Sequence, residues 1–276
     1  MSLAKSDKFI DSRVTTLRLK EMKDAGVKIS CLTAYDYTIA KIIDRAGIDV
    51  ILVGDSLGNV FQGNETTISV TIEDIIYHTK AVIKASERSL IVADMPFMSY
   101  QVSVNDAFRN AGKIMKETNC EAVKLEGAGL NNLEAISRMT EAGIPVMGHL
   151  GLTPQKINNF GSYRTRGTDP EEAKAIKEDA LKIQDAGAFA IVLEKIPKEL
   201  GKEITDSLAI PTIGIGAGPH CDGQILVNTD MLGLTVDFNP RFVRKYANLN
   251  EIISNSVSNY ITDIKNKDFP NESESY

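Results

Sequence analysis

The chain has 276 residues, 43% of them hydrophobic and 25% charged, and carries a formal net charge of −6. This composition is ordinary for a soluble globular protein, and the acidic balance argues against a nucleic-acid partner, whose phosphates require a basic face. No apolar run approaches the roughly 20 residues that span a bilayer, and the first residues lack the apolar stretch of a signal peptide. The cysteines Cys31, Cys120 and Cys221 are odd in number and far apart, which predicts no disulfide framework and favours a reducing compartment. We therefore expect a cytoplasmic protein.

Along the chain, short runs rich in Val, Ile and Leu alternate with longer segments of helical periodicity. An amphipathic segment at 12–26 predicts a helix before the first strand. The predicted strands are 28–33, 49–54, 90–94, 121–126, 145–150, 189–194 and 211–216, with an eighth at 224–227, where a strand and a helix start have the same pattern. The clearest helices between them are 69–86, 103–118 and 169–187, and a last helix is predicted at 249–266 before a polar tail.

This alternation predicts the fold class. Nearly continuous apolar runs are typical of parallel strands that are covered on both faces. Regular strand–helix units favour a parallel α/β sheet, and eight units without a break in composition favour closure into a (β/α)8 TIM barrel. We predict a single barrel domain over residues 1–276, extended by the N-terminal helix at 12–26 and by a C-terminal helix and tail at 249–276.

Ionisable side chains end five consecutive predicted strands. They are Asp55, Asp94, Glu126, His149 and Glu194. Catalytic groups of (β/α)8 enzymes lie where strands run out into loops, so we expect these side chains to converge. Carboxylates without a nearby Cys/His cluster suit a hard cation such as Mg²⁺. Taken alone, Asp55 before Ser-Leu-Gly is more often a turn former or a helix cap.

Three other features allow two interpretations each. Lys124 lies two residues before Glu126, on the same face of a strand, where it either meets an anionic substrate or points outward over the helices. His149 is either a histidine of the core or rim or a substrate contact. The glycine-rich segment 214–218 suits a phosphate site or close backbone packing, and its spacing is not that of a dinucleotide fingerprint.

Several segments of the sequence resemble the ketopantoate hydroxymethyltransferase family. The matching stretches are LTAYDY (32–37), VGDSLG (53–58), ADMPFMSYQ (93–101), VKLEG (123–127), GHLGLTPQ (148–155), VLE (192–194), IGIGAGPHCDGQILV (213–227) and DMLGL (230–234). The resemblance extends from the N-terminal helix to the terminal FPNESESY. It implies a (β/α)8 barrel, an assembly of ten subunits, and transfer of a hydroxymethyl group from 5,10-methylenetetrahydrofolate to 3-methyl-2-oxobutanoate, on the way to pantothenate.

The resemblance also implies roles for individual residues. Asp55, Asp94 and Glu126 match the magnesium positions. The positions that contact the 2-oxo acid are matched by Asp55, Ser56, Asp94 and Lys124. Glu194 matches the proton acceptor that forms an enolate, and His149 is a candidate contact to substrate or folate. Since such enzymes bind no phosphate, the glycines of 214–218 are interpreted as structural.

The sequence departs from the family pattern at a few positions. Ala128, Lys195 and the pair Asn228-Thr229 differ from the usual residues, and Lys195 directly follows the proton acceptor. Three other functions stay open. A Mg²⁺-dependent lyase or mutase of the isocitrate-lyase type would share the 2-oxo acid chemistry, but its Cys-Gly-His loop is absent from the sequence. A sugar-phosphate enzyme would use 214–218, and a non-catalytic, ring-forming barrel would not need the intact set of ionisable residues.

Overall fold

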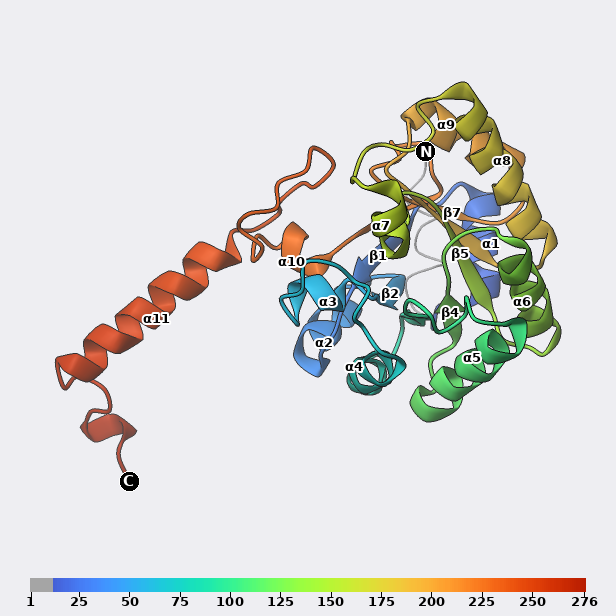
Figure 1. Ribbon diagram of the computed structural model, residues 1–276. Helices are drawn as coiled ribbons and strands as arrows, with labels where there is room; N and C mark the ends of the chain where they lie inside the picture. The colour runs from blue at the N-terminus through green and yellow to red at the C-terminus, as the bar shows by residue number, and fades with distance from the viewer. Residues whose placement is uncertain (1–11) are drawn as a thin grey trace. The chain divides into compact units, whose positions relative to one another are not determined.

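The structure is a computed structural model that describes residues 12–276 (Figure 1). The chain divides into two compact units, one ending at Val227 and the other comprising Asn228–Tyr276. The first unit contains a closed barrel of parallel strands in sequence order, in which β8 pairs with β1. The strands are β1 (Ile29–Thr33), β2 (Val50–Val53), β3 (Leu90–Asp94), β4 (Ala122–Lys124), β5 (Val146–Gly151), β6 (Ala190–Glu194), β7 (Thr212–Ile215) and β8 (Gly223–Leu226). The predicted (β/α)8 barrel is confirmed, and its eighth run is a strand.

Helices connect the strands and surround the barrel (Figure 1). In the first unit they are α1 (Thr16–Ala25), α2 (Tyr37–Arg45), α3 (Leu57–Val60), α4 (Ile72–Ala85), α5 (Val104–Thr118), α6 (Leu130–Glu141), α7 (Ile157–Phe160), α8 (Pro170–Asp185) and α9 (Lys198–Ser207). The predicted helix starts are confirmed by side-chain caps. Ser103 accepts a hydrogen bond from the amide of Asp106, and Asp169 caps the first turn of α8.

Two buried clusters of apolar residues result from the alternation along the strands. The inner cluster fills the barrel and includes Leu90 and Val92 of β3 and Ala190 and Val192 of β6. The residues between them, such as Ile91 and Ile191, belong to an outer cluster with the helices. Because side chains alternate between the two faces of a strand, the next inward residue after Val92 is Asp94.

Helix α1 closes the amino-terminal end of the barrel. Its residues Leu19 and Met22 are buried in the inner cluster, and Lys23 Nζ lies 2.7 Å from Asp222 Oδ2, directly before β8. The predicted N-terminal helix is thus confirmed, and it covers the amino-terminal end of the barrel. The opposite, carboxyl-terminal end is where the ionisable residues gather.

The second unit consists of α10 (Asn228–Met231), α11 (Leu249–Lys265) and the segments around them. No residue of α11 is buried within the described chain, although the helix carries several large apolar side chains. The predicted helix 249–266 is confirmed, ending one residue earlier. In the part of the chain that the structure describes, no helix is long and apolar enough to cross a membrane.

Candidate active site

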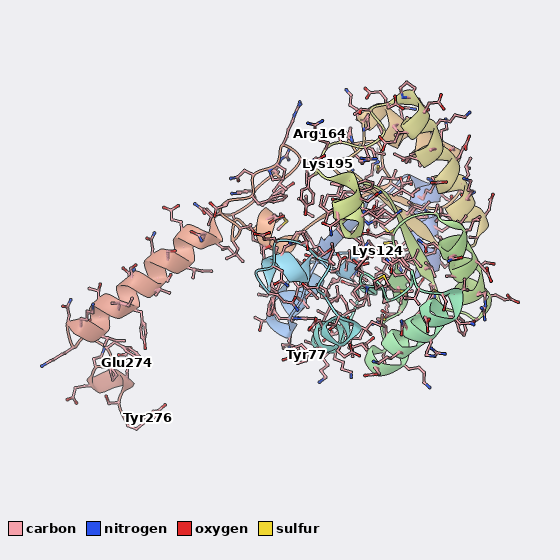
Figure 2. All side chains as sticks on the ribbon, in the orientation of Figure 1. Tyr77, Lys124, Arg164, Lys195, Glu274 and Tyr276 are labelled. Atoms are coloured by element: carbon pink, nitrogen blue, oxygen red, sulfur yellow. The ribbon has the colours of Figure 1, made fainter. Side chains whose placement is uncertain are left out.

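Asp94 and Lys124 form a buried ion pair at the carboxyl ends of β3 and β4. They are neighbours in the strand register, and Lys124 Nζ lies 2.7 Å and 2.8 Å from the two carboxylate oxygens of Asp94. Burial lowers the pKa of Lys124, but Asp94 and the nearby Glu126 outweigh it and raise that pKa above its ordinary value. The Lys124 side chain therefore points into the barrel and not outward (Figure 2), and its raised pKa favours the charged form.

Asp55 stands directly beside this pair, in the turn after β2. Its backbone amide donates to Asp94 Oδ2 at 3.2 Å, which brings the two carboxyl groups together. Burial, followed by the charges of Asp94 and Glu126, raises the pKa of Asp55 to about 8. Burial and Glu126 also raise the pKa of Asp94. A proton or a further cation is therefore needed to hold both side chains in place.

Glu126, His149 and Glu194 form a second group on the same side of the barrel. His149 Nδ1 lies 3.4 Å from Glu126 Oε1, and its Nε2 lies 3.3 Å from Glu194 Oε2. Burial and Lys124 lower the pKa of His149, but the two carboxylates raise it to about 9. The ring therefore carries a positive charge between two acids. Both ring nitrogens and Glu126 Oε1 are without a hydrogen-bond partner among residues 12–276.

Ser56 follows Asp55 and has a well-defined partner. Its hydroxyl lies 2.8 Å from the Tyr35 hydroxyl, and Tyr35 follows β1. Neither Tyr35 nor two other residues of the site, Tyr100 and Gln155, was predicted as functional. Gln155 donates to Asp55 Oδ2 at 2.9 Å, and Tyr100 donates to Gln155 at 2.6 Å. Tyr35, Tyr100 and Gln155 lie outside the strands and long helices, where the sequence has no periodic pattern. The one feature that could have pointed to them is that they lie in segments that resemble the family.

Lys195, the departure beside Glu194, points away from the carboxylate cluster. Its backbone is left-handed at φ +48°, and its Nζ donates to the carbonyl oxygen of Tyr163. Lys195 O in turn accepts from the amide of Arg166 at 2.9 Å. The side chain thus holds the 163–166 loop at the rim, whereas Lys124 lies inside the barrel (Figure 2).

The end of the glycine-rich segment, at Ala217 and Gly218, packs closely against α9. A side-chain carbon at Gly218, whose φ is +83°, would collide with the side chain of Lys198. Another at Gly201 of α9 would lie 2.5 Å from the carbonyl oxygen of Ala217. These contacts support the structural interpretation of the glycines.

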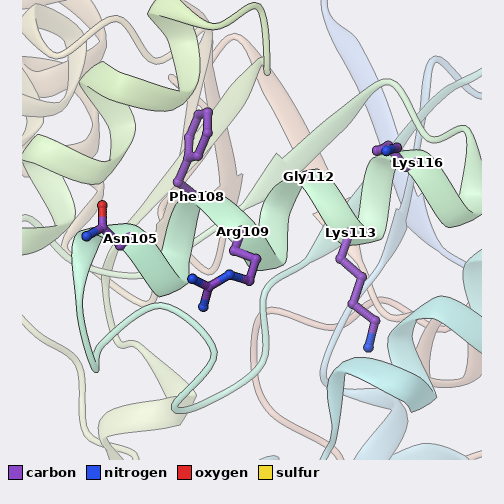
Figure 3. Close-up of a pocket in the computed structure, with 6 residues that line it drawn as sticks. All are labelled: Asn105, Phe108, Arg109, Gly112, Lys113 and Lys116. Carbon is purple, nitrogen blue, oxygen red and sulfur yellow. The ribbon is translucent and has the colours of Figure 1, made fainter.

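A hollow on the outer surface is a different feature from this site. It is lined by six residues of α5, namely Asn105, Phe108, Arg109, Gly112, Lys113 and Lys116 (Figure 3). Two of its cations are paired, Arg109 with Asp106 at 2.8 Å and Lys113 with Glu73 at 2.7 Å. Because it lies on a surface helix, it does not share the residues at the strand ends.

The carboxylates fit a magnesium ion by their chemistry and charge. Four carboxylates face two cations, Lys124 and protonated His149, so full ionisation leaves a charge of −2 that a divalent cation would balance. Glu126 Oε1 is buried, makes no hydrogen bond within residues 12–276 and lies 3.4 Å from His149 Nδ1, so it can still accept a hydrogen bond or bind a cation. Within residues 12–276, no three Asp, Glu, His or Cys side chains form a ready-made metal cage. Mg²⁺ sites commonly combine a few carboxylates with water and substrate oxygens as further ligands.

A closed parallel barrel with buried acids, a lysine and a histidine at its carboxyl end defines a (β/α)8-barrel enzyme. Residues 13–272 match the family described as ketopantoate hydroxymethyltransferase. The chain is 57% identical over 267 residues to the 3-methyl-2-oxobutanoate hydroxymethyltransferase of Chlorobaculum tepidum, with 95% of this chain and 96% of that protein covered. Identity to the protein of the same name from Chlorobium phaeobacteroides is 58%, over the same shares. The chain belongs to the ketopantoate hydroxymethyltransferase family and is a hydroxymethyltransferase.

Solved structures of other proteins share the fold. A phosphonopyruvate hydrolase in complex with oxalate and Mg²⁺ superposes with a TM-score of 0.61, covering 95% of this chain and 93% of that one. The two sequences are 12% identical, so the likeness is one of fold.

Proposed function

We propose that the chain transfers a hydroxymethyl group from 5,10-methylenetetrahydrofolate to 3-methyl-2-oxobutanoate, giving 2-dehydropantoate for pantothenate synthesis. The family membership supports the reaction class. The observation that carries the mechanism is the buried cluster in which Lys124 pairs with Asp94 and His149 lies between Glu126 and Glu194. Such a cluster suits a substrate that is an anion and that must become an enolate.

Binding of the 2-oxo acid rests on cations and on Ser56. Asp55, Asp94 and Glu126 would hold Mg²⁺, which when bound supplies Lewis acidity at the keto and carboxylate oxygens of the substrate. Lys124 adds positive charge where the enolate oxygen develops. The Ser56 hydroxyl, held by Tyr35, offers a hydrogen bond to the same substrate.

Glu194 is the general base in this proposal. It removes the proton from C3 of 3-methyl-2-oxobutanoate, a step that a positioned base accelerates by about 10²–10⁴-fold. The resulting carbon nucleophile bonds to the methylene carbon of the folate as one of that carbon's two C–N bonds breaks. Water then replaces the second nitrogen and becomes the hydroxyl group, and tetrahydrofolate leaves. His149, 3.3 Å from Glu194, orients the base by the attraction between its positive ring and the carboxylate. Its position also leaves it a candidate contact to substrate or folate.

The working form in this proposal is a homo-oligomer, with the decamer of the family as the expected size. The apolar, unburied surface of α11 supports association with further copies of the chain.

One assay tests the reaction directly. Purified protein is incubated with 3-methyl-2-oxobutanoate, methylenetetrahydrofolate and Mg²⁺, and 2-dehydropantoate is measured with and without EDTA. We expect product that depends on both substrates and disappears on chelation. Product formation that EDTA leaves unchanged would remove the metal from the mechanism, and absence of product would refute the function.

A further inference from the structure

The side chain of Gln155 is buried against Asp55 and Glu126, although it follows β5 and they follow β2 and β4. It lies in the short turn after β5, and 3% of the residue is exposed. Its Nε2 donates to Asp55 Oδ2 at 2.9 Å, and its backbone amide donates to Glu126 Oε2 at 3.2 Å. One residue therefore bonds an oxygen of each of two carboxylates, which follow β2 and β4.

The orientation of the amide is determined by its other partners. Nε2 lies 3.0 Å from the carbonyl oxygen of Met95, which can only accept a hydrogen bond, so this end must be the NH₂ group. The Tyr100 hydroxyl accepts from the amide of Glu126 at 3.1 Å and donates its own proton to Gln155 Oε1 at 2.6 Å. Gln101 Nε2 donates to the same Oε1 at 3.0 Å. All four hydrogen-bonding positions of the amide are therefore used.

Gln155 donates a hydrogen bond to one oxygen of each carboxylate and to neither of the other two oxygens. Glu126 bonds Gln155 through Oε2, whereas its Oε1 has no hydrogen-bond partner in the described chain. Asp55 bonds Gln155 through Oδ2. A carboxylate anchored in this way cannot rotate freely, and this is the arrangement that outer hydrogen bonds give to metal-binding side chains.

We propose that Gln155 is a positioning residue of the cation site, which holds Asp55 and Glu126 at a set separation and directs one oxygen of each toward a divalent cation. The inference rests on the proposed function, since it assumes that these carboxylates bind Mg²⁺. Gln155 itself is not a ligand, because its oxygen already accepts two hydrogen bonds from Tyr100 and Gln101. It acts through the carboxylates.

The test replaces Gln155 by a side chain of similar length without polar hydrogens. Gln155→Met removes the donor to Asp55 and keeps the volume. Binding of Mn²⁺ alone, a paramagnetic substitute for Mg²⁺, is measured from the loss of the free-ion EPR signal. We expect the dissociation constant to rise by about 10-fold, as befits loss of a hydrogen bond to a charged group. The Mg²⁺ concentration for half-maximal activity should rise similarly, while saturating Mg²⁺ restores most of kcat.

Gln101→Met is the matched control, because Gln101 bonds the same amide oxygen and contacts neither carboxylate. It should change Mn²⁺ affinity by less than about threefold. Tyr100→Phe, which removes one of the two hydrogen bonds to Gln155 Oε1, should give an intermediate loss and serves as the second variant if Gln155→Met does not fold. Wild-type affinity in a folded Gln155→Met or Tyr100→Phe protein would overturn the positioning role alone. Failure of the wild type to bind Mn²⁺ would instead overturn the proposed metal site as well.

Discussion

Glu194 differs from the other carboxylates of the cluster in its access to solvent. Its side chain is 18% exposed, whereas those of Asp94 and Glu126 are 2% and 1% exposed. A base must meet the C–H bond of a substrate that enters from outside, while a metal ligand profits from burial. The structure therefore supports the division of roles between Glu194 and the buried acids.

We expect Glu194→Gln to lose proton transfer and to keep binding. The amide has the shape of the carboxylate but cannot accept the C3 proton, so Mg²⁺-dependent binding of 3-methyl-2-oxobutanoate should persist in calorimetry. NMR in D₂O with Mg²⁺ and no folate measures C3–H exchange, which should slow by about 10²-fold or more. Exchange at the wild-type rate in this variant would make another group the base, and His149 could be that group only in its neutral form. A wild type without exchange would mean that proton removal requires folate.

The raised pKa values make the stability of the metal-free protein depend on pH. Asp55, with a pKa of about 8, binds a proton in the folded state that it lacks in the unfolded state between about pH 4 and pH 8. His149 adds stability that is complete below about pH 6.5 and is lost as pH rises through about 9. Both contributions therefore fall as pH rises.

Magnesium and protons should compete for the same cluster. In EDTA, we expect the melting temperature to fall between about pH 6 and pH 9, and added Mg²⁺ should raise it more at about pH 8.5 than at about pH 6. Differential scanning fluorimetry measures both. Asp55→Ala is the control and should lose most of the Mg²⁺ response. An equal Mg²⁺ effect at both pH values would contradict the raised pKa of Asp55.

At the scale of elements, the end of β5 is packed tightly against the end of β6. Gly151 is paired with Glu194 in the register and has a φ of +91°. A side-chain carbon at Gly151 would collide with the carbonyl oxygen of Glu194. The glycine thus allows the two strand ends, and with them His149 and Glu194, to approach.

Two glycine substitutions separate this steric effect from backbone strain. Gly143 has a φ of +86°, close to that of Gly151, but an added side-chain carbon there meets nothing within 4 Å. Gly143→Ala should cost about 1 kcal/mol in urea denaturation, from strain alone, and leave C3–H exchange unchanged. Gly151→Ala should cost more and should slow exchange, because the backbone of Glu194 must shift. Equal effects of the two substitutions would speak against the close contact.

The predicted end of the fourth strand was wrong. The run 121–126 predicted one strand, but β4 ends at Lys124 and Glu126 stands in the loop beyond it. An apolar residue such as Leu125 continues the pattern because it is buried under helices, not because it is in the sheet. A run of apolar residues indicates burial, but it does not distinguish a strand from a buried loop.

At the scale of the molecule, α11 is an amphipathic helix whose apolar side is not buried. Its exposed apolar residues are Ile252, Ile253, Val257, Tyr260, Ile261 and Ile264, spaced so that most share one face. An apolar face of this extent is typical of an interface, so it supports a contact of α11 with a neighbouring subunit in the proposed homo-oligomer. The number of subunits stays a prediction.

Sedimentation should show an assembly much larger than one 276-residue chain. Val257→Lys, in the apolar face, should weaken assembly strongly, because it places a charge in the interface. Asn255→Lys, on the opposite side of α11, is the matched control and should sediment as wild type. Deletion of residues 268–276 tests the tail itself. A wild type that sediments as a monomer at micromolar concentration would contradict the interface.

The sequence by itself determined the barrel, the order of its strands and the positions of its charged strand ends. These follow from local periodicity, since a parallel strand covered on both faces must be apolar until it leaves the sheet. Asp94 and Glu194 were therefore predictable as inward groups, and the resemblance to one family supplied their expected roles.

The tertiary structure alone decided which charges meet. Only the register between neighbouring strands brings Lys124 onto Asp94 and places His149 between Glu126 and Glu194. Only the folded loops bring Gln155 to Asp55, 100 positions away in the chain. Periodicity predicts which face of a strand a side chain takes. The distances between side chains at the strand ends depend on the register of neighbouring strands and on the path of the loops, and neither leaves a periodic pattern in the sequence. For this reason the sequence pattern could not predict the roles of Gln155 and Tyr100.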